Sequence, residues 1–333
     1  NRIIENVFAS LNISPIKGRY LPGLAAGGIE YQNKSGEASY PGVTNNELDF
    51  LREAPKEMKR LLKIKLSKLL AHFNNEQIDI LTCSSVLATR FSPTINLNGI
   101  FSLIPNDIQL QIEIQSSIKI IMNQILKLAK DAGLENSFFL HIAPNLGRKD
   151  DQEEIKYAIK GDVGTTDIQL MLRGAIKESG LLVLINKYLK KRDGIAPFGE
   201  DFNVRNAPDS IPELKELCQS KVEKNKMPIL IGVGDTVTSH QSKDGKSWLR
   251  GGSDRGFLTL IQELGEQYNK ENKVLLVDSS GGEVDRPSLS NKDLAGISDP
   301  EDPLKFNAYF KNGPISYIEW FNQLAKERSK MKL

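Results

Sequence analysis

Apolar side chains recur every three or four residues in six stretches of the chain, and this spacing predicts amphipathic helices. In the second stretch Ile114, Ile118 and Ile121 share one face, Asn106 is expected to cap the first turn, and Gly133 is expected to end the helix. The predicted helices span residues 46–73, 107–131, 175–191, 211–223, 254–268 and 314–330.

Short apolar runs between these helices predict strands. They lie at 137–142, 167–172, 228–234 and 273–277. The last two runs are continuously apolar and alternate with helices, which is typical of a parallel sheet covered on both faces. Residues 17–43, rich in Gly and Pro, predict a loop and a short hairpin. The pattern therefore indicates a doubly wound α/β C-terminal half after a mixed α+β middle.

Length and charge narrow the class of protein. A chain of 333 residues favours two domains. The 44 Lys and Arg nearly balance the 42 Asp and Glu, so we expect no nucleic-acid partner, which would need a basic face. The longest apolar run, 181–185, is too short for a membrane span. Cys83 and Cys218 form no CxxC pair, so we expect no disulfide and a cytoplasmic location.

Two aspartates are candidate metal ligands. Strand 228–234 runs out into Asp235, and Asp254 stands where the helix 254–268 begins. Ligands of open parallel sheets bind beyond the carboxyl ends of the strands, and a helix start favours a carboxylate. Because Mg²⁺ takes oxygen ligands, commonly one or two carboxylates, the pair predicts a magnesium site. The alternative is that Asp235 belongs to an ordinary turn and Asp254 is a simple helix cap.

Other motifs are weaker. Lys177, near the start of a predicted helix, is either a cation aimed at a phosphate or a surface lysine paired with Glu178. Gly232 and Gly234 suggest a dinucleotide-binding turn, but Val237 stands where GxGxxG needs its third glycine.

The strand ending in Gly-Asp, the later Asp at a helix start and the earlier Lys resemble the haloacid-dehalogenase superfamily of phosphotransferases. A closer resemblance, over essentially the whole chain, is to the cyanobacterial glucosylglycerol-phosphate phosphatases. It is carried by short segments in a fixed order. They are 20–28, 136–139, 143–148, 161–167, 171–174, 232–239 (GVGDTVTS), 251–255 (GGSDR) and 301–305.

The resemblance implies a fold and its domains. It implies an α/β fold, with a haloacid-dehalogenase-like, doubly wound parallel-sheet core and an inserted α+β cap that reads the sugar. Residues 1–43 are then part of the core, residues 44–172 the cap, and residues 173–333 the rest of the core with the metal site.

The resemblance also implies an activity, the removal of phosphate from glucosylglycerol 3-phosphate to give glucosylglycerol, an osmolyte made under salt stress. The small-molecule partner is this sugar phosphate, and association with the sugar-phosphate synthase is a further expectation. An Asp attacks phosphorus, and water then hydrolyses the aspartyl-phosphate. Mg²⁺ is the implied cofactor, on Asp235 and Asp254. Lys177, or else Arg173, contacts the phosphate, and three cap residues are expected to contact the sugar: Asn145, Arg148 and Asp167.

The sequence departs from the superfamily by lacking two of its motifs. No strand ends in DxD, and the Ser or Thr motif that follows the second strand is absent, so both are expected upstream of Asn1. Asp278 follows the strand 273–277, but Ser280 replaces the second acid, so we interpret Asp278 as a strand-end residue near the site. We expect a truncated chain that releases no phosphate by itself. Two alternatives stay open: a non-catalytic sugar-phosphate-binding or regulatory relative, and a phosphatase for sucrose or trehalose phosphate.

Overall fold

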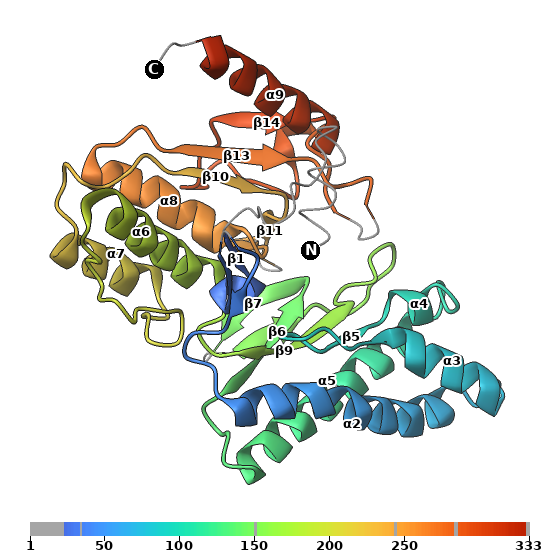
Figure 1. The fold of residues 1–333 in the computed structure, drawn as a ribbon. Coiled ribbons are helices and arrows are strands. Elements are labelled where there is room, and N and C mark those ends of the chain that lie inside the picture. The colour runs from blue at the N-terminus through green and yellow to red at the C-terminus, as the bar shows by residue number, and fades with distance from the viewer. Residues whose placement is uncertain (1–22, 34, 150–151, 243–244, 283–285, 331–333) are drawn as a thin grey trace. The chain divides into compact units, whose positions relative to one another are not determined.

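The computed structural model describes residues 23–33, 35–149, 152–242, 245–282 and 286–330 (Figure 1). They form two compact units. The first holds the described residues up to Ile142 and Tyr157–Val222, and the second holds Ala143–Lys156 and those from Glu223 onward. The predicted division into a core and a cap at residues 44 and 172 stays a prediction, and its first 22 residues lie outside the described part.

A four-stranded sheet with two long helices dominates the first unit. Helices α2 (Asn45–Leu69) and α5 (Ile108–Asp131) pack on each other, α2 also contacts β4, and α5 contacts β9. The β4–β5 and β5–β9 pairs are antiparallel. In sheet order the strands are β4 (Val86–Leu87), β5 (Thr94–Asn96), β9 (Asp167–Leu172) and β6 (Phe138–Ala143).

The sequence explains both long helices. Thr44 and Glu47 form a reciprocal capping box at the start of α2. Asp107 caps α5 by accepting a hydrogen bond from the backbone amide of Leu110 at 3.0 Å, so the predicted cap at Asn106 was one residue early. The apolar face predicted for α5 is confirmed for its isoleucines, which are almost fully buried: Ile114, Ile118, Ile121 and Ile125. Leu128, predicted as the last residue of this face, is 42% exposed.

Smaller elements complete the first unit. The hairpin predicted within 17–43 is confirmed in its described part as an antiparallel sheet, β1–β2–β3. Two predicted helices are also confirmed as α6 and α7, which pack on each other. The bounds are β1 (Gly23–Ala25), η1 (Ala26–Gly28), β2 (Glu30–Gln32), β3 (Ala38–Ser39), α3 (Asn75–Ser85), α4 (Asn98–Phe101), α6 (Lys177–Asp193) and α7 (Ile211–Lys221).

A parallel sheet forms the centre of the second unit, as its continuously apolar strands predict. Its order is β10 (Ile231–Gly234), β13 (Lys273–Val277), β14 (Ala308–Phe310), and both pairings are parallel. Helix α8 (Arg255–Tyr268) packs on β10 and β13, and α9 (Pro314–Lys330) contacts β14 (Figure 1). The α/β class is therefore confirmed.

Two hairpins that the sequence did not predict belong to the same unit. Strand β11 (Thr238–Gln241) pairs antiparallel with β12 (Trp248–Gly251), and β7 (Asn145–Lys149) pairs with β8 (Gln152–Ile155). Strand β7 packs against β12. A short turn, η2 (Lys292–Leu294), follows β13. None of the described helices has both the length and the apolar character that crossing a bilayer requires.

Candidate active site

A pocket opens where β10 and β13 end, at the edge of the sheet that the strand pattern predicted. Asp235 follows β10, and Asp278 follows β13. The segment 286–289 closes another side. The lining residues are Asp235, Thr236, Val237, Thr238, Leu276, Val277, Asp278, Ser279, Arg286, Pro287, Leu289 and Ile297.

Asp235 presents its carboxylate to this pocket, with 46% of the side chain exposed. The hydroxyl of Thr236 donates to Oδ1 at 2.7 Å, and the guanidinium of Arg286 donates to Oδ2 at 2.7 Å. Burial raises the pKa of Asp235, but the bond from Thr236 and the charge of Arg286 outweigh it, and the pKa is lowered. The group is therefore an anion at neutral pH.

Asp254 is buried directly behind Asp235. It occupies the cap position of α8 but makes no capping hydrogen bond, so the ordinary-cap alternative does not hold. Instead its Oδ2 accepts from the backbone amides of Asp235 at 2.8 Å and Thr236 at 3.0 Å. The two aspartates predicted to bind the metal therefore lie next to each other, because the carboxylate of Asp254 accepts a hydrogen bond from the backbone amide of Asp235.

Two glycines permit this approach. A Cβ at Gly234 would lie 2.8 Å from Cβ of Asp254, closer than side chains tolerate. Gly252 has φ +100°, and a Cβ there would lie 2.4 Å from the carbonyl oxygen of Thr236. The amide of Asp254 donates to that same oxygen at 3.0 Å. The Gly-x-Gly pattern in β10 therefore serves close packing at the strand end.

Asp278 lies in the pocket, as predicted for a strand-end residue near the site. Its Oδ1 accepts from the amide and hydroxyl of Ser280 at 2.8 and 2.6 Å. Its Oδ2 accepts from the hydroxyl of Ser288 at 2.9 Å and the amide of Leu289 at 2.7 Å. Burial raises the pKa of Asp278, but these bonds outweigh it and lower the pKa. The carboxylate thus holds the loop that follows β13.

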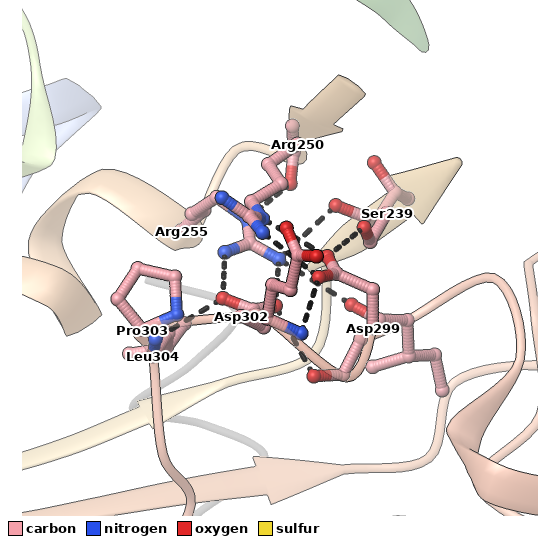
Figure 2. Close-up of polar contacts among 12 residues, drawn as sticks. Ser239, Arg250, Arg255, Asp299, Asp302, Pro303 and Leu304 are labelled. Atoms are coloured by element: carbon pink, nitrogen blue, oxygen red, sulfur yellow. Dashed lines mark hydrogen bonds and ion pairs between the residues drawn. The ribbon is translucent and has the colours of Figure 1, made fainter. Parts of the chain in front are cut away.

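Two arginine–carboxylate pairs with buried carboxylates lie in the same unit as the site (Figure 2). Arg250 in β12 donates to both oxygens of Asp299 at 2.9 and 2.8 Å. Arg255, the residue after Asp254, donates to both oxygens of Asp302 at 2.9 and 2.8 Å. The carboxylate side chains are completely buried, so these bidentate pairs hold β12 and the start of α8 against residues 299–302.

Further bonds complete this paired network. The hydroxyl of Ser239 donates to Asp299 (Figure 2). The hydroxyl of Ser298 donates to Asp302 at 3.1 Å. The hydrogen bond from Arg250 has the largest effect on Asp299 and lowers its pKa. Burial would raise this pKa, but the bonds from Arg250 and Ser239 together outweigh it. Burial raises the pKa of Asp302, but the bond and charge of Arg255 outweigh it and lower the pKa. Both carboxylates are therefore ionised at neutral pH.

The predicted sugar-contacting residues fall in both units. Asn145 begins β7 in the second unit, where its side-chain amide donates to Glu153 at 3.2 Å and its Oδ1 lies close to Gly251. The side chain of Arg148 lies outside the described part. Asp167 begins β9 in the first unit, where it accepts from the side chains of Asn96 at 2.9 Å and Thr166 at 3.0 Å. Their contacts with a sugar stay predictions.

The two predicted phosphate-binding cations lie in the first unit. Lys177 is the first residue of α6 and is exposed. Arg173 is exposed, and its carbonyl accepts a hydrogen bond from Arg205. Both phosphate-binding roles stay predictions. Arg286 was missed by the sequence analysis, although its place nine residues after β13 put it within reach of a strand end.

The residues around Asp235 suit a hard cation. The carboxylate is ionised, faces an open pocket and already holds one cationic group, the guanidinium of Arg286. No group of three or more His, Cys, Asp or Glu side chains gathers into a metal site within the described residues. This is compatible with Mg²⁺, which takes one or two protein carboxylates and completes its shell with water and phosphate.

Comparison with known proteins gives one consistent result. The model of the family described as glucosylglycerol-phosphate phosphatase matches residues 1–325. The chain is 41% identical over 338 residues to a Synechocystis protein named glucosylglycerol-phosphate phosphatase, and the match covers 98% of this chain and 80% of that protein. No solved structure matches the chain.

Proposed function

We propose that this chain, which belongs to the family of glucosylglycerol-phosphate phosphatases, is a phosphoric monoester hydrolase that acts on glucosylglycerol 3-phosphate. The reaction breaks the phosphate ester. Water supplies the oxygen that stays on phosphorus and the proton that stays on the released glucosylglycerol. Its product would serve as an osmolyte in the cytoplasm.

The pairing of Asp235 with Asp254 at the end of β10 carries this proposal. Asp235 offers an ionised carboxylate to the pocket, and Asp254 fixes the backbone on which that carboxylate stands. We propose that both acids hold Mg²⁺, which when bound would neutralise charge on the transferring phosphate. The sequence expectation of such a pair came from strand-end chemistry alone, so the observed contact supports it independently of the family.

Other residues have accessory roles in the proposal. Lys177 or Arg173 supplies positive charge to the phosphate, and Asn145, Arg148 and Asp167 contact the sugar. The haloacid-dehalogenase-like core with its cap, and the aspartyl-phosphate route, are further parts of the proposal. None of the described residues is assigned as the nucleophile.

The test measures phosphate release from glucosylglycerol 3-phosphate by the purified protein, with and without Mg²⁺. Asp235→Asn should lower kcat/KM by at least about 100-fold, because it removes the charge that faces the pocket. A matched control is Glu223→Gln, which changes an exposed carboxylate of the same unit. Equal activity of the two variants would contradict the proposed site.

The same assay separates the alternatives. Faster turnover of sucrose or trehalose phosphate would contradict the proposed substrate but keep the site. Binding of the sugar phosphate without any turnover would favour the non-catalytic relative. An assay of the 333-residue chain by itself tests the expectation that it releases no phosphate.

A further inference from the structure

Arg286 has a contact that the proposed function does not use. Its Nη1 donates to Oδ2 of Asp235 at 2.7 Å and to the hydroxyl of Ser279 at 2.8 Å. The hydroxyl of Ser279 donates in turn to the backbone carbonyl of Asp235 at 3.1 Å. The guanidinium therefore sits against the carboxylate that is proposed to hold the metal.

Charge in the pocket makes this contact informative. Among the described residues that line the pocket, Arg286 alone carries a positive charge, opposite the carboxylates of Asp235 and Asp278. A phosphate that entered the pocket would be repelled by both carboxylates. A cation at Asp235 and the guanidinium of Arg286 are the two groups placed to offset that repulsion.

The ion pair is also open to exchange. The side chains of Arg286 and Asp235 are 28% and 46% exposed, and ion pairs with this exposure are weak. A divalent cation that binds Asp235 would displace the guanidinium by competition and by repulsion. The released guanidinium has a planar set of donors that matches phosphate oxygens.

We propose that Arg286 serves two partners in turn, Asp235 while the metal position is empty and the substrate's phosphate once Mg²⁺ is bound. This inference rests on the proposed metal site at Asp235. It assigns Arg286 a phosphate-binding role and makes it a competitor of the metal for the same carboxylate.

The two roles predict opposite effects of one substitution. In Arg286→Gln the competing charge is gone, so Mg²⁺ should bind about three- to tenfold more tightly in the absence of phosphate. Inorganic phosphate should bind the Mg²⁺-loaded variant about tenfold more weakly, because a charge-assisted hydrogen bond is lost. Arg286→Lys keeps the charge, so Mg²⁺ affinity should stay near that of the wild type while phosphate binding weakens.

The measurement is calorimetric titration of the complete protein with Mg²⁺, followed by phosphorus NMR titration of the loaded protein with inorganic phosphate. Arg192→Gln, which removes a guanidinium paired with Asp193 at the end of α6, is the control and should change neither affinity. Tighter Mg²⁺ with weaker phosphate in Arg286→Gln supports the inference. Weaker binding of both, or no change in either, overturns it and assigns Arg286 a structural role.

Failure of the proposed function gives a different pattern. If the wild type binds no Mg²⁺, the metal site itself is wrong and the inference falls with it. If the wild type binds Mg²⁺ through Asp235, shown by loss of binding in Asp235→Asn, but Arg286→Gln binds it no more tightly, only the inference about Arg286 is overturned.

Discussion

The buried pair of Asp302 with Arg255 offers the sharpest test of how the site is held (Figure 2). Substitution Asp302→Asn keeps the shape of the side chain and removes its charge. The side chain of Asp302 is completely buried and that of Arg255 is 12% exposed, so the guanidinium would lose its counter-charge with little water to replace it. The substitution also replaces one acceptor oxygen by an NH₂ group. This donor would face the N–H donors of Arg255, so one of the two hydrogen bonds would be lost.

The expected cost follows from this burial. Removing one partner of a buried ion pair destabilises a protein by about 3–5 kcal/mol, and we expect about 3 kcal/mol because the asparagine side chain still offers one acceptor. The urea m-value of a domain of this size is about 1–3 kcal/mol per M. The unfolding midpoint should therefore fall by about 1–3 M urea.

The chain contains its own probe for this measurement. Both of its tryptophans, Trp248 in β12 and Trp320 in α9, lie in the second unit. Tryptophan emission during urea unfolding therefore reports on the unit that carries the substitution. The control is Glu223→Gln, whose exposed pair with Lys226 should contribute no more than about 0.5 kcal/mol. Equal midpoints for the two variants at pH 7 would refute the argument from burial.

The pH dependence of the stability difference between the wild type and Asp302→Asn gives a second check. The pKa of Asp302 is lower in the folded state than in the unfolded chain, where it is about 3.9. The carboxylate therefore contributes its stability above pH of about 4 and loses it as pH falls towards the folded pKa. The gap between wild type and Asp302→Asn should be complete at pH 7 and narrow below pH of about 4. A gap that stays constant down to pH of about 2 would mean that lost charge is not the cause.

Two further substitutions test a close packing contact and a second buried ion pair. Gly234→Ala should cost about 2 kcal/mol by tryptophan emission, because its Cβ would collide with the start of α8, whereas Gly281→Ala, with open space around it, should cost little. Glu47→Gln should lower the thermal unfolding temperature of the first unit by circular dichroism, because it breaks a buried pair with Arg205 at 2.6 Å, and exposed Glu53→Gln should not. Equal effects within either pair of variants would contradict these readings.

Periodicity predicted the long elements because packing decides them. Helices such as α2, α5 and α8 and the strand β13 bury apolar side chains along their length, and their positions were right to within a few residues. Strand β10 was also predicted, although its Ile231 is 53% exposed. Helix α3 was missed because few of its residues are apolar. The hairpins β7–β8 and β11–β12 were missed because strands of four or five residues carry too little pattern to distinguish them from loops.

The site was predictable to the extent that it depends on strand ends. Asp235 and Asp254 were expected together because a strand end and a helix start meet at the same edge of a parallel sheet. Arg286 reaches Asp235 from 51 residues away, and Asp302 reaches Arg255 from 47 residues away. Both partners come from loops after β13, and the path of a loop depends on contacts that no local pattern records.

The hydrogen bonds that Asp254 accepts decide how a substitution at this residue must be interpreted. Its carboxylate has a structural role, holding the amides of Asp235 and Thr236, beside any role with a metal. Asp254→Ala would remove both roles, and lost Mg²⁺ binding would then not identify the cause. Asp254→Asn keeps a side-chain oxygen for the two amides and removes only the charge. A folded Asp254→Asn variant with weakened Mg²⁺ binding would therefore assign the charge of Asp254 to the metal, whereas unchanged binding would leave it a purely structural residue.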